Sequence, residues 1–382
     1  MRATFSLLLP ALLIGAPQAL ATVHAGDLLV TDYNGARVLA VDPDSGQVRV
    51  LSPPSGGANL LQRPTGIVMA RFGVIFVVDA ATDQMIGIDA ATGEQFVIKS
   101  GLGVPIEVGG EPFGLALRET EGAYELWISA RGSDEIRHVV GLIGFGIASE
   151  PLSTDTRWAG ARGIAVHGDV LDVAVDEGQG YWVLRLDGTW IGDPFLESTI
   201  VGGTQDRSPG VSVGDVEPYS FGNVLAFYDT VFTERNVMTV IPGISACDSA
   251  TSGVAARGTQ TFVETKIFVT QVEPADGTPL HCPGALATGF DGALYVTDSL
   301  LASGGGAQLV RLWPAKPLAD PEVVARLPDA PGSLTLPTGL AVAPVDAPEP
   351  DSGPAALSCA IAIATLAGRR RRSLGAETPT GP

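Results

Sequence analysis

The chain has 382 residues, and its 48 glycines and 28 prolines make up about a fifth of them, well above ordinary usage. The formal net charge is −19, and such an acidic surface repels phosphate backbones, which argues against nucleic acid as a partner. Many short apolar runs cut by Gly, Pro, Asn and Asp favour strands and turns over helices.

Residues 1–21 have the composition of a secretory signal peptide. Arg2 supplies a positive charge, Phe5–Gly15 is apolar, and Ala19-Leu20-Ala21 fits the small-x-small cleavage rule. The apolar run is too short to span a bilayer. A buried N-terminal strand is the alternative, but the run lacks strand alternation. We therefore expect an exported protein whose mature form begins at Thr22.

One pattern then recurs: a glycine, alternating apolar residues, and an aspartate at the end of a strand. Copies begin at Gly26, Gly73, Gly168, Gly222 and Gly292, and a weaker copy begins at Ala123. The equivalent positions are Asp32, Asp79, Ala130, Asp176, Asp229 and Asp298, separated by 47, 51, 46, 53 and 69 residues. This period is typical of four-stranded propeller blades, and each copy is predicted to form two strands joined by a turn. The longest interval is explained by an irregular loop over Ile244–Gln260.

A second repeat precedes most copies. It reads PTGIVMA at Pro64, PFGLALR at Pro112, ARGIAVH at Ala161, PGALATG at Pro283 and PTGLAVA at Pro337. Small residues let strands crowd around a central axis, so these segments are predicted to be the innermost strands. Before Gly222 the match fails, so that blade is expected either to be irregular or to begin within 211–220.

The two ends of the array complement each other. The first copy has no innermost strand before it, and PTGLAVA has no outer copy after it. We expect Leu28–Thr31 to pair with Leu340–Ala343, which removes an exposed sheet edge. The sequence thus predicts an all-β, six-bladed β-propeller over 25–344, closed by its N- and C-terminal strands. Seven blades are the alternative, with a degenerate blade between Gly243 and Pro283.

The segments LLVTDYNGARVLAVD, IFVVDAATDQMIGID and LYVTD resemble NHL-repeat and gluconolactonase-like propellers. This resemblance specifies a fold and little about function. A gluconolactonase-type activity would imply a divalent-metal-dependent lactone or ester hydrolase with Glu, Asn and Asp ligands in the channel. That set has no counterpart here, because the inner strands carry Thr65-Gly66, Phe113-Gly114, Arg162-Gly163 and Thr338-Gly339. A virginiamycin-lyase-like activity lacks its catalytic histidine.

The strand-end carboxylates have two interpretations. A ring of Asp32, Asp79, Asp176, Asp229 and Asp298 at one mouth of the channel would attract a divalent cation such as Ca²⁺. Alternatively, each carboxylate caps its own turn, which we favour because a repeated residue usually serves the repeat. No other cofactor is expected. The four histidines share no metal-ligand spacing, and no Ser-His-Asp arrangement or nucleophile elbow is visible.

Two cysteines, Cys247 and Cys282, fall in the irregular part of the array. Export permits a disulfide between them, and their shared location favours it. The strand order opposes it if Lys266–Val272 is an outermost strand, so both states remain open. Cys359 lies in the C-terminal segment.

The C-terminal region combines three features in order. A linker over 345–354 contains Pro348-Glu349-Pro350, Ala355–Gly368 is apolar, and Arg369, Arg370, Arg371 and Arg372 follow, before a tail over 373–382. Residues 355–372 therefore form a membrane-inserting segment, a short transmembrane helix with a positive stop. This order resembles the PEP-CTERM sorting signal, which implies cleavage by an exosortase-type enzyme. A plain tail anchor is the competitor, because 14 apolar residues are few for a span and the family usually ends soon after its arginines.

These features predict an exported protein of a Gram-negative bacterium, transiently anchored in the inner membrane and then placed on the cell surface or outside. We expect a non-catalytic binding or scaffold module for a protein or glycan. A divalent-metal-dependent lactone or ester hydrolase is the alternative. Membrane contact is expected only through the C-terminal segment.

Overall fold

The computed structural model describes residues 22–53, 58–120, 122–142, 146–158, 160–167, 170–175, 180–188, 211–219, 222–229, 253–257, 283–299, 306–313, 322–331 and 335–344. In these ranges the protein is all-β, apart from one short 3-10 helix, η1 (Thr156–Trp158). No helix among the described residues is long and apolar enough to cross a membrane, and residues 355–372 lie outside them.

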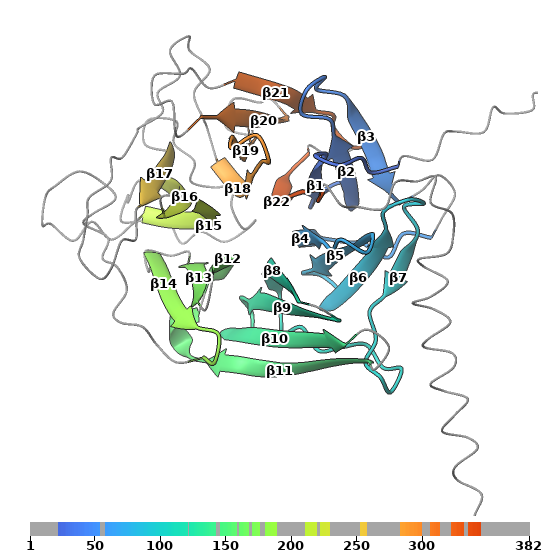
Figure 1. The fold of residues 1–382 in the computed structure, drawn as a ribbon, viewed down its shortest axis with the longest axis vertical. Helices are drawn as coiled ribbons and strands as arrows, with labels where there is room; N and C mark the ends of the chain where they lie inside the picture. Colours follow the sequence, from blue (N-terminus) through green and yellow to red (C-terminus); the bar gives the residue numbers. More distant parts are fainter. Residues whose placement is uncertain are drawn as a thin grey trace, which may run out of the picture.

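The described strands form six antiparallel sheets arranged around a common centre (Figure 1). Sheet 1 has the order β22 (Pro337–Val342), β1 (Leu28–Asp32), β2 (Arg37–Val41) and β3 (Val48–Ser52). Sheet 2 consists of β4 (Pro64–Met69), β5 (Val74–Asp79), β6 (Gln84–Asp89) and β7 (Gln95–Val97). Sheet 3 consists of β8 (Pro112–Thr120), β9 (Ala123–Ala130), β10 (Glu135–Leu142) and β11 (Gly146–Thr154).

The remaining sheets continue the same order along the chain. Sheet 4 has β12 (Ala161–His167), β13 (Val170–Val175) and β14 (Gly180–Arg185). Sheet 5 has β15 (Val211–Tyr219), β16 (Gly222–Asp229) and β17 (Gly253–Arg257). Sheet 6 has β18 (Pro283–Thr288), β19 (Leu294–Ser299), β20 (Ala307–Leu312) and β21 (Glu322–Leu327).

The sequence repeats correspond to these strands. Each Pro-x-Gly-type segment begins the first strand of a sheet, and each Gly-to-Asp copy supplies the second strand, as expected. Of the two possibilities expected before Gly222, the structure has the strand that begins within 211–220, which is β15. The predicted irregular loop over Ile244–Gln260 was wrong in part, because β17 lies inside it and pairs with β16. The short GVAAR run carries no repeat motif, and only its pairing with β16 identifies it as a strand.

The first strands of the six sheets lie innermost and contact their neighbours around the centre (Figure 1). β4 contacts β22 and β8, β12 contacts β8 and β15, and β18 contacts β15 and β22. Sheet 1 contains both ends of the described chain, because β22 pairs with β1, placing Leu28 opposite Val342 and Val30 opposite Leu340. The two strands expected to pair do so, but Leu28–Thr31 lies opposite 339–342, one residue earlier than the expected Leu340–Ala343.

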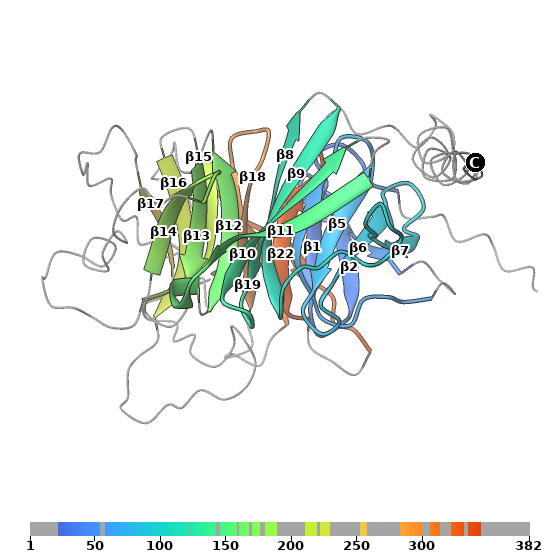
Figure 2. The same cartoon turned by 90° about the horizontal axis from the view of Figure 1, so that it is seen from below.

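Neighbouring first strands begin side by side, since Gly339 in β22 lies against Thr65 in β4 and Gly114 in β8 lies against Arg162 in β12. These strands therefore run in one direction, and the body, seen from the side in Figure 2, has two distinct ends. We call the end where they begin, and where β1 and β5 finish at Asp32 and Asp79, the aspartate face. The opposite end, where β22 finishes at Val342 and β1 begins, is the tail face.

The core lies in the seams between neighbouring sheets. Leu29, Ile67 and Ile75 fill the seam between sheets 1 and 2, while Leu28, Leu309 and Leu340 fill the seam between sheets 6 and 1. Every residue of β1 is buried, because this strand has a sheet on each side of it. Such two-sided burial explains why the strands are nearly continuous apolar runs, and each buried Leu or Ile contributes about 1.5–3 kcal/mol.

Candidate functional site

The first strands surround a small hollow of about 40 Å³ near the centre of the body. Its wall is made of backbone and apolar or hydroxyl side chains from sheets 1 to 4: Gly66, Ile67, Phe113, Gly114, Leu115, Gly163, Ile164, Thr338, Gly339 and Leu340. These are the Pro-x-Gly-type segments identified in the sequence.

Glycine is required in this wall by close contact between neighbouring sheets. A Cβ on Gly339 would lie 2.2 Å from the backbone oxygen of Thr65, and a Cβ on Gly114 would lie 2.0 Å from that of Arg162. Real Cβ atoms do not approach backbone oxygens so closely. The glycines therefore determine how tightly the strands gather around the hollow.

Hydroxyl groups connect the sheets around the same centre. Thr31 Oγ1 in sheet 1 donates to the backbone oxygen of Thr65 in sheet 2 at 2.5 Å. Thr65 Oγ1 donates to Pro112 O in sheet 3 at 2.8 Å, and Ser129 Oγ of sheet 3 donates to the backbone oxygen of Arg162 in sheet 4. These bonds satisfy backbone oxygens on the inner strands and hold adjacent sheets together.

Asp79 shows how a strand-end aspartate is used. Its Oδ1 accepts hydrogen bonds from the backbone N–H groups of Ala81 and Thr82, both at 3.1 Å, which caps the turn that follows β5. Its Oδ2 accepts from the backbone N–H groups of Gln62 and Arg63 at 2.6 and 2.8 Å. Asp79 is fully buried and fastens the loop that leads into β4 to the turn after β5.

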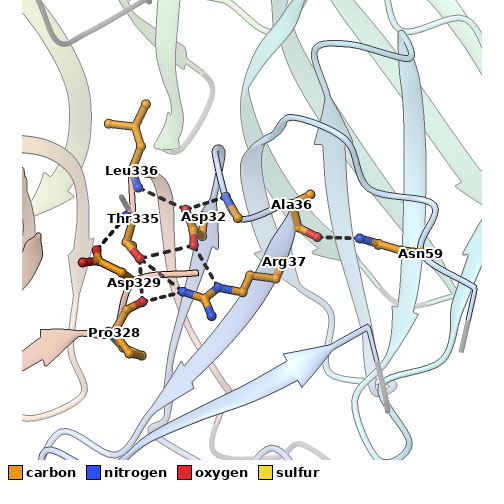
Figure 3. A network of polar contacts seen from close by, with 9 residues as sticks. Asp32, Ala36, Arg37, Asn59, Pro328, Asp329, Thr335 and Leu336 are labelled. Carbon is orange, nitrogen blue, oxygen red and sulfur yellow. Dashed lines mark hydrogen bonds and ion pairs between the residues drawn. The ribbon is translucent and has the colours of Figure 1, made fainter. Parts of the chain in front are cut away.

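Asp32 performs the same task with loops from the two ends of the chain (Figure 3). Its Oδ1 accepts from Gly35 N–H in the following turn and from Leu336 N–H just before β22, both at 3.0 Å. Its Oδ2 pairs with the guanidinium of Arg37 at 2.8 Å. Arg37 also donates to Pro328 O and, at 3.2 Å, to Thr335 Oγ1, so the loop before β22 is held by both partners.

The other three candidate aspartates are placed less completely. Asp298 is fully buried at the end of β19 and accepts from Gln308 Nε2 at 2.9 Å. Asp229 is the last residue of β16, and Asp176 lies outside the described residues. Asp32, Asp79 and Asp298 stand in separate sheets and bond to groups of their own surroundings. Within the described ranges, no group of three or more His, Cys, Asp or Glu side chains is placed to hold a metal ion.

Sheet 3 replaces the missing aspartate by a glutamate on the neighbouring strand. Ala130 pairs directly with Glu135, and Glu135 Oε1 accepts from Ser133 Oγ at 3.0 Å and from Arg137 Nη1 at 3.1 Å. Ser133 Oγ accepts in turn from Gly110 N–H, in the loop that leads into β8. The sequence repeat did not identify Glu135, because the carboxylate has moved to the opposite strand of the hairpin.

At the tail face, burial perturbs two titratable groups. Burial raises the pKa of Asp27, and this exceeds the opposing effects of a hydrogen bond from the His24 N–H and the charge of Arg49. Burial, with the nearby charge of Asp291, also raises the pKa of the Tyr295 hydroxyl, which donates to Asp291 Oδ2 at 3.1 Å. Burial is the main cause of both shifts.

Several other predicted residues fall outside the described part of the chain. These are the cysteines Cys247 and Cys282 and the sorting-signal residues Pro348, Glu349, Pro350, Arg369, Arg370, Arg371 and Arg372.

Comparison with known proteins supports the fold. No protein-family model and no curated protein sequence matches the chain. The crystal structure of a nidogen/laminin complex is 14% identical, with a TM-score of 0.51 over 84% of this chain and 98% of that one. A protein of unknown function from Bacteroides caccae is 10% identical, with a TM-score of 0.49 over 83% and 98%. A gluconolactonase from Xanthomonas campestris is 16% identical, with a TM-score of 0.39 over 53% and 64%.

The solved structures that resemble this chain are β-propeller proteins of the NHL and related types. At these identities the similarity shows the fold alone. A β-propeller hosts many unrelated functions, so the fold does not select between binding and catalysis.

Proposed function

We propose that this protein is a non-catalytic β-propeller that acts as a binding or scaffold module for a protein or glycan. The observation that carries the proposal is the use of the strand-end carboxylates. Both carboxylate oxygens of Asp32 and of Asp79 accept hydrogen bonds from groups in or beside the loops that they hold. The central hollow is lined by backbone, apolar and hydroxyl groups. Such a wall offers shape and hydrogen bonds to a ligand rather than acid, base or metal chemistry.

We also propose that the six sheets are the six blades of a closed propeller, with β22 and β1 completing one blade from both chain ends. The supporting observations are the β1–β22 register and the circle of contacts among the first strands. A seventh blade would have to come from the segment between Gly243 and Pro283, where β17 is described as part of sheet 5.

The targeting features complete the proposal. Residues 1–21 are removed on export, 25–344 form the propeller, 345–354 link it to the sorting or anchor segment 355–372, and 373–382 form the tail. An exosortase-type enzyme of a Gram-negative host acts near Pro348-Glu349-Pro350 and places the body on the cell surface or outside. The linker position supports this division, because β22 ends at Val342, six residues before Pro348.

A paired assay separates binding from metal-dependent hydrolysis. The protein is screened against glycan arrays and surface-protein pools, and in parallel its melting temperature is measured with Ca²⁺ or Zn²⁺. A ligand at 100 times its Kd stabilises by about 2.7 kcal/mol, so a metal site would give a clear shift. Saturable binding to one glycan or protein, without a metal shift, is expected. Metal-dependent lactone or ester hydrolysis that is lost in Asp298→Asn would overturn the proposal in favour of the hydrolase.

A further inference from the structure

Both ends of the described chain meet at the tail face. Ala343, directly after β22, donates its N–H to Asp27 O at 2.8 Å and accepts from Gly26 N–H at 3.0 Å. Val23 N–H donates to Ala90 O, beyond the end of β6, at 3.1 Å. The chain therefore leaves the body from this face on its way to the C-terminal segment.

The tail face also carries most of the exposed large apolar side chains among the described residues. Phe72 and Phe290 lie in the β4–β5 and β18–β19 turns and are 36% and 61% exposed, and Leu142 at the end of β10 is 48% exposed. Leu102 and Val104, at 81% and 56%, lie in a hairpin closed by the Lys99–Pro105 bridge.

The hairpin of Leu102 follows the aspartate-side end of β7, where Ile98 N–H bonds Met85 O, and its tip turns back to the rim of the tail face. Gly101 lies against Gly146, the first residue of β11: a Cβ built there would be 3.1 Å from the Gly101 Cα. Gly146 pairs with Leu142, so the two exposed leucines come from adjoining hairpins at the seam between sheets 2 and 3.

The aspartate face has the opposite character. Its described loops expose polar side chains, namely Asn34, Asn59, Gln62, Asp83 and Ser133. The remaining exposed apolar residues, Val50, Phe96 and Val323, lie on the outermost strands β3, β7 and β21. The two faces thus differ in polarity, and the difference coincides with the side from which the chain leaves.

The connection to the apolar segment is short. Ten residues, 345–354, separate Pro344 from Ala355, and ten extended residues span at most about 35 Å. If Ala355–Gly368 lies in a bilayer, the tail face cannot be far from the membrane surface.

We propose that the tail face rests on the membrane while the C-terminal segment is inserted, and that Leu102, Leu142 and Phe290 contact the lipid interface. The aspartate face is then turned away and is the face that meets the ligand. This inference rests on the proposed membrane insertion of residues 355–372. The tail face also exposes Asp44, Glu94 and Asp291 against one well-exposed arginine, Arg71. The acidic excess favours a neutral phospholipid surface over an anionic one.

Hydrogen exchange of the full chain on neutral phosphatidylcholine vesicles tests the orientation. Binding should slow amide exchange at 100–104 and 289–292 and leave 33–36, 59–63 and 131–134 unchanged. If the protein floats with the vesicles but amide exchange slows on the aspartate face, or on neither face, the proposed orientation is wrong. The proposed membrane anchor is then still supported. If the protein does not float with the vesicles, both the orientation and the membrane anchor are wrong. Ligand binding by the propeller is tested separately, by the glycan and protein screen.

Matched variants exclude other occupants of the tail face. Leu102→Ser combined with Phe290→Ser should abolish the protection of both loops while the chain still floats. Val323→Ser, which changes an exposed apolar residue on the outermost strand β21, should preserve it. Amide exchange at these loops could instead be slow without vesicles and become fast when 355–368 are deleted. That result would show that the apolar segment itself covers this face, and would overturn the proposal.

Discussion

The carboxylate of Asp32 accepts a hydrogen bond from the backbone N–H of Leu336, so two residues 304 positions apart share one bond at 3.0 Å. Asp32 ends the first strand of the body, and Leu336 directly precedes the last one. The same carboxylate is paired with Arg37, which donates to Pro328 O and thereby holds the same loop. A single buried ion pair thus fixes where the end of the chain joins its beginning (Figure 3).

Replacing Asp32 by Asn should destabilise the fold strongly. The change removes the partner of a buried guanidinium, which typically costs about 3–5 kcal/mol. Urea unfolding followed by circular dichroism measures the loss. Asp42→Asn is the matched control, because Asp42 caps an exposed turn through Asp44 and Ser45 N–H groups and a surface change of this kind stays within about 0.5 kcal/mol. Equal losses for the two variants would contradict the role of Asp32.

Replacing Gly339 by Ala should also destabilise the body, because the added methyl group meets the backbone oxygen of Thr65 at 2.2 Å. Overpacking of this kind costs about 1–3 kcal/mol. Gly110→Ala is the control, since its nearest atom would be 3.5 Å away. A melting temperature for Gly339→Ala equal to that of Gly110→Ala would show that the sheets can move apart at the hollow.

Removing the last strand should cost far more than removing the much longer tail. Deletion of 337–344 exposes the edge of β1 and breaks its pairing with β22, whereas deletion of 346–382 leaves every described strand in place. Melting curves of the two truncations make the comparison. Equal melting temperatures would contradict the proposed closure and the six-blade count.

Asp27 should make the fold less stable as pH rises through the acid range. Its pKa is raised above the model-compound value of 3.8 by burial, so the folded state binds its proton more tightly than the unfolded state. Stability from this group is therefore greatest below pH 3.8 and is lost as pH rises through the folded pKa. Relative to the wild type, Asp27→Asn should gain unfolding free energy over that window. A difference in unfolding free energy between Asp27→Asn and the wild type that stays constant with pH would contradict the raised pKa of Asp27.

Processing should leave a protein that begins near Thr22. In a host with an exosortase it should also lack the residues beyond about Pro350. Intact-mass analysis of exported material measures both ends. Exported protein that retains Arg369 to Arg372 would favour a plain anchor.

Much of the architecture could be predicted from sequence because each repeat encodes the same local information. The alternation in VIFVVD predicts a strand, and the Pro-x-Gly segments predict crowded inner strands. The complementary ends of the repeat array predicted the pairing of β1 with β22.

The polar contacts could not be predicted in the same way. Asp32 was expected to cap its own turn, and it does bond Gly35. Its bond to Leu336 depends on a loop 300 residues distant. Glu135 replaces an aspartate from the opposite strand, where a linear repeat gives no signal. The third strand of sheet 5, β17, has a sequence without a motif, and only its partner β16 defines it.

The β1–β22 pairing also determines when sheet 1 can be completed during folding. β1 is made before its partner β22, which follows roughly 310 residues later, or on the order of 15–60 s at ordinary rates of synthesis. Until then one edge of β1 has no neighbour, and sheet 1 lacks one of its four strands. The pairing follows only when β22 has been made and, in an exported chain, has crossed the membrane. A chain interrupted anywhere upstream of Pro337 therefore keeps an open sheet edge, which marks it for proteolysis or aggregation.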